Sequence, residues 1–262
     1  MPEHAPILEF DPSPTAVIEP HMMREVVQVP PATVMCFFSD VIERLRQSGA
    51  ATLFELQAAH GTHPVLQVDT RKGPVAVFHP GVGAPLAAAF FEEAIASGCR
   101  NFVALGGAGS LRADLTAGHA VAPTAAIRDE GTSYHYLAAA REISAQPDAQ
   151  QIVQRSLSGA DIPFLEGKTW TTDGLYRETR AKVDRRVAEG CVTVEMEASA
   201  LLAVAAFRSV RLGYLLAAAD TLASDVWEDR GFFDDTDARM ALFEVAAGAA
   251  LALSLPSTWG VG

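Results

Sequence analysis

The chain has 262 residues, of which 20 are Lys or Arg and 32 are Asp or Glu, so its formal net charge is −12 with histidine neutral. Apolar residues make up 49% of it, which is enough to bury a substantial core and excludes a disordered or fibrous chain. The acidic balance also excludes a protein that binds nucleic acid or an anionic membrane through surplus basic side chains.

No stretch is apolar over the roughly 18 residues that a transmembrane helix needs. The first twenty residues carry acids and prolines instead of the basic and apolar regions of a secretory signal. The three cysteines, Cys36, Cys99 and Cys191, are scattered and odd in number, which fits a reducing compartment. We therefore expect a cytoplasmic α/β protein with neither a nucleic-acid nor a membrane partner.

The apolar pattern predicts a single domain over residues 1–262, in which the proline-rich residues 1–31 form an extended segment. Helical spacing predicts a helix over 32–49, with Gly49 as its stop. The order strand, helix, strand, glycine loop is typical of a parallel sheet. The other expected elements of this half are strands at 52–56, 65–68, 75–78 and 102–105 and a helix at 86–97.

The second half repeats the alternation of strands and helices. We expect the pair Arg185-Arg186 to be exposed in a turn, and Arg208 and Arg211 to be solvated charges at a helix end. The expected elements are strands at 191–194 and 212–219 and helices at 198–207 and 240–253.

Two glycine-rich segments, Gly81-Val82-Gly83 and Gly106–Gly109, follow predicted strands. Glycine lets backbone N–H groups approach an anion or a sugar closely, although both segments could also be simple tight turns. Neither completes the dinucleotide-binding pattern G-x-G-x-x-G, because the sixth positions are Leu86 and Arg112.

Acidic residues stand at two further strand ends. Asp220 follows a very apolar strand, so its carboxyl group should be partly desolvated and suited to donating a proton, unless it only caps the next segment. Glu195-Met196-Glu197 lies between a strand and a helix, and an extended backbone would put both acids on one side. No His or Cys spacing matches a metal site, so neither metal nor cofactor is expected.

The string Thr193–Ala200 resembles the ribose-binding segment of the nucleoside phosphorylase family, which includes purine nucleoside phosphorylase, uridine phosphorylase and the methylthioadenosine nucleosidases. The resemblance implies a single α/β domain around a twisted, partly barrel-like mixed sheet flanked by helices. Further landmarks follow in family order between about residues 65 and 250, at Gly81–Pro85, Leu105–Leu111, Ala117–Val121, Asp129–Ser133 and Thr171–Tyr176.

The resemblance also implies cleavage of the N-glycosidic bond of a purine-type nucleoside. Glu197 would hold the ribose hydroxyls, and Asp220 would protonate the leaving base, which suits an oxocarbenium-like transition state. The remaining residues that it implies for the substrate site are Met196, Glu195, Val194, Gly83, Gly106, Gly107, Leu175 and, from a neighbouring subunit, His4.

The phosphate site departs from the family pattern. Where the phosphorylases place Arg before the second glycine segment and Ser or Thr within it, this chain has Ala104 and Gly107. The family's N-terminal phosphate loop is reduced to Ile18–Met22. A phosphate dianion is expensive to hold without a guanidinium group. The candidates to replace that group are Arg24, Arg71, Arg112 and His79.

Three reactions or roles therefore stay open. The first is phosphorolysis to free base and sugar 1-phosphate, with inorganic phosphate as co-substrate. The second is hydrolysis by water, for which Glu19 is a candidate base. The third is a non-catalytic nucleoside-binding protein, which the presence of both Glu197 and Asp220 disfavours.

The identity of the base is open as well. The Gln-x-Arg pair with which uridine phosphorylases read uracil is absent at Thr179 and Ala181, although Arg180 lies one position away. Asp220 favours a base that leaves protonated, and Arg230 could pair with it as an Arg does in the purine enzymes. The resemblance further implies a homo-oligomer, either a dimer or a hexamer.

Overall fold

A computed structural model describes residues 5–59 and 61–255 of the chain. Its strands are β1 (Thr33–Cys36), β2 (Ala51–Ala58), β3 (Gly61–Thr70), β4 (Gly73–Phe78), β5 (Asn101–Ser110), β6 (Ala120–Asp129), β7 (Glu142–Ser144), β8 (Phe164–Thr172), β9 (Cys191–Glu195), β10 (Arg211–Thr221) and β11 (Glu228–Asp229). Its α-helices are α1 (Pro20–Met23), α2 (Ser39–Gln47), α3 (Ala84–Ala96), α4 (Pro147–Gly159), α5 (Arg180–Ala188), α6 (Ala198–Arg208) and α7 (Thr236–Ser254). Four short 3-10 turns are η1 (Pro6–Leu8), η2 (Thr132–His135), η3 (Leu175–Arg177) and η4 (Phe232–Asp234).

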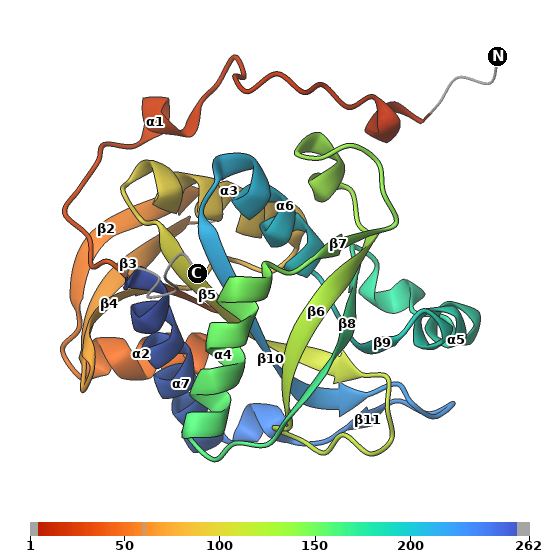
Figure 1. Ribbon diagram of the computed structural model, residues 1–262. Helices are drawn as coiled ribbons and strands as arrows, with labels where there is room; N and C mark the ends of the chain where they lie inside the picture. Colours follow the sequence, from red (N-terminus) through yellow and green to blue (C-terminus); the bar gives the residue numbers. More distant parts are fainter. Residues whose placement is uncertain (1–4, 60, 256–262) are drawn as a thin grey trace, which may run out of the picture.

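All eleven strands belong to one mixed sheet, in the order β11-β10-β6-β8-β9-β5-β1-β4-β3-β2, with β7 paired to β6 (Figure 1). Because β10 also pairs with β5, the strands β10, β6, β8, β9 and β5 close into a ring. Beyond this ring, the sheet continues from β5 through β1, β4, β3 and β2. The predicted fold class, a single α/β domain around a partly barrel-like sheet, is confirmed.

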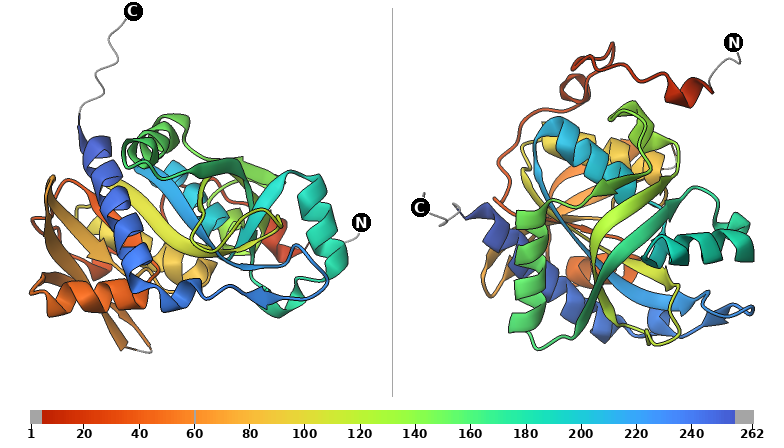
Figure 2. Two further views of the ribbon diagram at one scale, coloured as in Figure 1. Left: turned by 90° about the horizontal axis from the view of Figure 1, so that it is seen from below. Right: turned by 45° about the vertical axis from the view of Figure 1, so that its right-hand side comes forward.

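Apolar side chains fill both faces of the sheet. Helices α3 and α6 pack against each other over one core, which contains Phe91, Phe102 and Leu201. Helices α2, α4 and α7 cover a second core around Leu105 and Phe243. Helices α4 and α7 lie side by side in both views of Figure 2. Within the described residues, no helix is both long and apolar enough to cross a membrane.

Residues 5–31 run across the outside of the molecule, above α3 and α6 in Figure 1. This segment has only two short helical pieces, η1 and α1. Some of its apolar side chains are almost fully solvated, and Val17 is 95% exposed. The segment therefore contributes little to the core.

Two predicted elements were wrong in detail. The helix expected over 32–49 is strand β1 followed by the shorter helix α2, because Thr33–Cys36 are all buried and pair with β4 and β5. The glycine loop expected at Gly106–Gly109 is the second half of β5, where the missing side chains let other groups pack closely on the strand. The sheet is mixed, as the family resemblance implied.

Gln150 of α4 and Gln146, the residue that precedes this helix, form hydrogen bonds with the backbone of β10 and of the residue before it. Gln150 donates from Nε2 to the Tyr214 carbonyl at 2.7 Å and accepts from the Tyr214 N–H at 3.0 Å. Gln146 does the same with the Val210 carbonyl and the Leu212 N–H. These bonds fix α4 to a stretch of β10 whose backbone would otherwise be buried without partners.

Replacing Gln150 with Leu should lower the free energy of unfolding by about 2–4 kcal/mol, because it leaves a buried N–H and a buried carbonyl without partners. Gln151→Leu, at an exposed position of the same helix, should change it by less than about 0.5 kcal/mol. Urea denaturation of the three proteins measures the difference. Equal stability of the two variants would contradict the account.

Candidate active site

The centre of the site is the junction of β8, β9 and α6, where the carboxylate of Glu195 is buried. Its Oε2 accepts hydrogen bonds from the backbone N–H groups of Glu197 at 2.7 Å and Ala198 at 2.6 Å, at the start of α6. Its Oε1 accepts from the Thr171 hydroxyl at 2.6 Å. A negative charge at a helix N-terminus is favourable, and these donors compensate for its burial. Glu195 thus holds the junction together. That it also borders the base, as the resemblance implied, stays a prediction.

Strand β9 ends at Glu195, so the two acids of Glu195-Met196-Glu197 do not share one side. Glu197 turns toward the glycine turn after β4 and accepts from the Gly83 N–H at 2.5 Å. Gly83 has φ +92°, which a glycine adopts without strain. Met196, half-buried, lies between the two acids. The structure thus separates the contacts of the two acids, which the sequence pattern placed on one side.

Glu197 is a carboxyl group that resists ionisation. Burial raises its pKa, and the nearby Glu195 and Asp173 raise it further, against the hydrogen bond from Gly83. Burial likewise raises the pKa of Glu195, but its hydrogen bonds from Thr171 and the start of α6 oppose that rise. A positive charge beside Glu197 would favour its ionised form and so lower its pKa.

A second network of buried hydrogen bonds stabilises this junction. Ser199 donates to Glu130 Oε1 at 2.9 Å, and its own N–H donates to the Thr171 hydroxyl at 3.0 Å. Glu130 also accepts from the backbone N–H groups of Thr132 at 2.6 Å and Ser133 at 2.9 Å. The first turn of α6 is thereby tied to both β8 and η2.

Asp220 lies near the same region because it pairs with Gly109 in the sheet. In the sheet, Gly109 is paired with Val194 on one side and Asp220 on the other. A Cβ at Gly109 would lie 3.0 Å from Val194 Cγ1 and 3.3 Å from Asp220 Oδ1, so the glycine makes room for both. Asp220 Oδ2 accepts from the indole N–H of Trp227 at 2.6 Å. The structure therefore brings Val194 and Asp220 together around one glycine.

Two residues beside Asp220 were missed by the sequence interpretation. Trp227 binds it directly, whereas Arg230, the expected partner, donates to the Leu115 carbonyl instead. Glu178 lies close enough that Asp220, together with burial, raises the pKa of Glu178 to about 7. No sequence signal singled out either residue, because both come from irregular segments after η3 and β10.

The expected phosphate segment is surrounded by apolar groups. A Cβ at Gly106 would lie 3.3 Å from the Phe37 ring, and one at Gly107 would lie 3.3 Å from the Phe233 ring. His79 packs edge-on against Phe37, with ring centroids 6.0 Å apart. Burial lowers the pKa of His79 below its usual 6.5, so it is neutral at pH 7 and supplies no cation.

The other candidates for the phosphate or water site lie elsewhere in the chain. Glu19 and Arg208 form an ion pair at 3.5 Å at the C-terminal end of α6, about 16 Å along that helix from Glu197. Arg24 donates to Glu93 at 2.6 Å on the outer side of α3. Within the described chain, the segment 18–22 therefore does not meet Gly106 and Gly107.

Arg71 and Arg112 do not replace the missing arginine either. Arg112 forms a bidentate, exposed pair with Asp114 at 2.9 and 2.7 Å. Arg71 lies in the turn before β4 and lines a cavity of about 990 Å³ between α4 and α7. Apart from Arg71, this cavity contains none of the predicted site residues. A smaller pocket of about 460 Å³, lined by Pro85 and Asp173 among others, adjoins the Gly83 turn.

The remaining predictions have mixed outcomes. Leu175 is 51% exposed on η3, and His4 lies outside the described residues. Arg180 donates to the carbonyls of Leu222 at 3.0 Å and Ser224 at 2.7 Å, so it fixes the segment after Asp220 and is not free to read a base. In the described ranges, no cluster of three potential ligands that could hold a metal ion is found.

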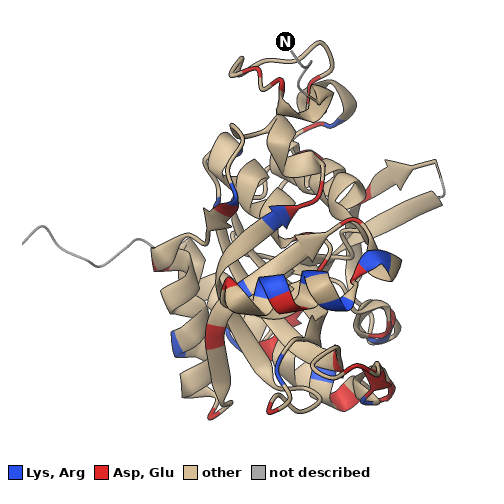
Figure 3. Ribbon diagram, turned by 90° about the vertical axis from the view of Figure 1, so that its right-hand side faces the viewer, with Lys and Arg blue, Asp and Glu red and all other residues tan. Residues whose placement is uncertain are grey.

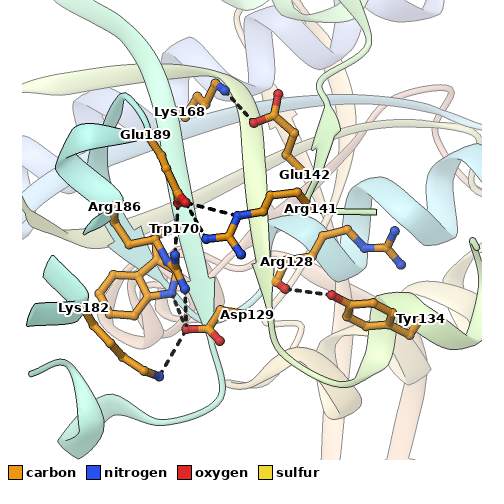
Figure 4. Close-up of polar contacts among 10 residues, drawn as sticks. All are labelled: Arg128, Asp129, Tyr134, Arg141, Glu142, Lys168, Trp170, Lys182, Arg186 and Glu189. Carbon is orange, nitrogen blue, oxygen red and sulfur yellow. Dashed lines mark hydrogen bonds and ion pairs between the residues drawn. The ribbon is translucent and has the colours of Figure 1, made fainter. Parts of the chain in front are cut away.

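Three of the four arginines that were expected to be solvated form ion pairs. Arg186 is buried over the Trp170 ring and donates to Asp129 Oδ2 at 3.2 Å, as Figure 4 shows; only Arg185 is exposed. Figure 3 shows several basic residues and a single acidic one along α5. Arg208 pairs with Glu92 at 2.6 Å, and Arg211 with Asp148 at 2.9 Å. The partners are distant in sequence, so local pattern did not indicate them.

Replacing Glu197 with Gln should stabilise the protein while removing its negative charge. The raised pKa of Glu197 means that folded protein binds more protons than unfolded protein from about pH 4.5 upward, so its contribution to stability is lost as pH rises through the folded pKa. The variant should therefore gain little at pH 5 and several °C at pH 8, at about 2–4 °C per kcal/mol. Thermal scans at both pH values test this, and an equal gain at both would contradict it.

Nucleoside phosphorylases of known sequence are similar to part of this chain. A guanosine phosphorylase of Halorubrum lacusprofundi is 29% identical over 163 residues, which is 61% of this chain and 66% of that protein. A uridine phosphorylase of Treponema pallidum is 31% identical over 156 residues, 55% of this chain and 60% of that protein. The matched regions thus span slightly less than two thirds of these relatives.

Solved structures share the fold. A purine nucleoside phosphorylase of Toxoplasma gondii in complex with immucillin-H superposes with a TM-score of 0.72 at 19% identity, over 86% of this chain and 92% of that one. An AMP nucleosidase of Bacteroides thetaiotaomicron gives 0.67 at 20% identity, over 88% and 90%. The model of the phosphorylase superfamily matches residues 31–253. This chain belongs to the phosphorylase superfamily.

Proposed function

We propose that this protein cleaves the N-glycosidic bond of a nucleoside. The observation that carries the proposal is the placement of the two acids: Glu197 follows β9 beside the glycine turn, and Asp220 lies near the end of β10. Both β9 and β10 pair with β5 at Gly109. Glu197 would hold the sugar hydroxyls, and Asp220 would give a proton to the departing base. Relatives named as guanosine and uridine phosphorylases support the same bond cleavage.

The environment of Glu197 suits this role. The sugar gains positive charge as the bond to the base breaks. Burial and Glu195 disfavour the ionised form of Glu197 in the free protein. A developing positive charge relieves that penalty, so the attraction is stronger in the transition state than with bound substrate. Asp220 favours a base that must be protonated to leave, as a purine is.

For the second reactant, the surroundings of Gly106 and Gly107 support water over phosphate. Phe37 and Phe233 pack there, Ala104 stands in place of the arginine, and His79 is neutral. A dianion placed there would lose its hydration without a paired cation. Phosphorolysis, expected from the family resemblance, is the second candidate, favoured by the names of the relatives.

The decisive assay incubates the protein with a panel of purine and pyrimidine nucleosides, with and without phosphate, and identifies sugar products by mass. Hydrolysis predicts free sugar at a rate that phosphate does not change. Sugar 1-phosphate formed only with phosphate would contradict the choice of water and support phosphorolysis. The control is Asp220→Asn, which should lose about a hundred-fold or more in rate on purine nucleosides; an unimpaired variant would reject the role of Asp220.

We further propose that the protein is a homo-oligomer. Apolar side chains beside the site are exposed in a single chain: Val82 is 66% exposed on the glycine turn, and Leu175 and Tyr176 are 51% and 94% exposed on η3. A second copy that covered them would also exclude water from the site. Light scattering should give at least twice the mass of one chain, and Val82→Lys should reduce it. A monomer at micromolar concentration would contradict the proposal.

A further inference from the structure

Trp227 makes an unusual contact for a tryptophan at the surface. The side chain is 61% exposed, yet its indole N–H points at the carboxylate of Asp220, with 2.6 Å between Nε1 and Oδ2. Because most of the ring is in solvent, it gains little from burial. The hydrogen bond to the carboxylate therefore makes a large contribution to its position.

The chain around Trp227 is fixed on both sides. Trp227 precedes the two residues of β11, which pair with Asp220 and Thr221 at the end of β10. Arg180 holds the carbonyls of Leu222 and Ser224, so the intervening residues are tied to the start of α5. The pairing of β10 with β11 and the hydrogen bonds of Arg180 thus fix the positions of both the carboxylate and the indole.

The two oxygens of Asp220 face different surroundings. Oδ2 receives the Trp227 indole, and Oδ1 lies over Gly109, where a Cβ would be 3.3 Å away. An indole N–H can only donate, so an oxygen that accepts from it cannot direct a proton of its own along the same line. A proton on Asp220 is therefore favoured on Oδ1, which lies next to Gly109, the residue of β5 that pairs with Val194 of β9.

We propose that Trp227 is a positioning residue that reserves Oδ2 of Asp220 as an acceptor and so places the acidic proton on Oδ1, aimed at the leaving base. This inference rests on the proposed function. Trp227 thereby takes the place of Arg230, which the family resemblance suggested as the partner of Asp220. A neutral indole does so without adding a positive charge beside the base.

The kinetic test compares two substrates. Inosine needs protonation of its base, whereas p-nitrophenyl β-D-ribofuranoside releases a stable anion and needs no acid. Trp227→Phe keeps the ring and removes the donor. It should lower kcat on inosine about ten-fold to a hundred-fold, leave KM within about three-fold, and leave the nitrophenyl substrate almost unaffected. Trp227→Gln, which restores a donor, should recover part of the rate on inosine.

Other patterns would overturn the role. Unchanged kcat on inosine in Trp227→Phe, or an equal loss on both substrates, would mean that Trp227 is only structural. Failure of the unmodified protein to cleave any nucleoside would overturn the proposed function itself, and this role with it. The two failures are therefore distinguishable.

Fluorescence tests the contact independently of activity. The emission of Trp227, obtained as the difference between the unmodified protein and Trp227→Phe, should change when Asp220 is replaced with Asn, because a charged acceptor becomes a neutral one. Identical emission of Trp227 with Asp and with Asn at position 220 would overturn the contact on which the inference stands.

Discussion

The buried carboxylate of Glu195 is the interaction on which the rest of the site depends. A charge without water is costly unless donors surround it, and here the donors come from Thr171 on β8 and from the first N–H groups of α6. Satisfying Glu195 therefore fixes where β9 must end and where α6 must begin. The residue between these two points, Glu197, is turned outward to the Gly83 N–H as a consequence.

This arrangement places a second carboxyl group beside the first, and the pKa of Glu197 is raised by burial and by that neighbour. A negative charge on Glu197 is therefore unfavourable in the free protein, and a cationic sugar beside it would relieve that penalty. The hydrogen bonds of Ser199 to Glu130 and Thr171 stabilise the first turn of α6 next to it. Such a site trades stability for electrostatic stabilisation of a transition state. The strands β5, β6, β8, β9 and β10, which carry or adjoin the site, are hydrogen-bonded into a closed ring.

Much of the fold, and the places of the acids at strand ends, could be predicted from local sequence pattern. The positive-φ turn at Gly81–Gly83, the helix after Glu197 and the apolar strand before Asp220 follow from residue type and spacing. Strand β1 was hidden because its four buried residues run into the apolar stripe of α2. Contacts between distant segments, such as Arg186 with Asp129 and Trp227 with Asp220, depend on the closed sheet and leave no periodic signal. The same limit applies to the inward turn of Glu195.

The central claim is that Glu197 and Asp220 serve one nucleoside, held between the glycine turn and the end of β10. A crystal structure with a C-nucleoside, whose carbon–carbon bond between sugar and base resists cleavage, tests it most directly. The account predicts sugar hydroxyls within hydrogen-bonding distance of Glu197 and a ring nitrogen facing Oδ1 of Asp220. A nucleoside bound with neither carboxyl group in contact, for example in the cavity between α4 and α7, would contradict it.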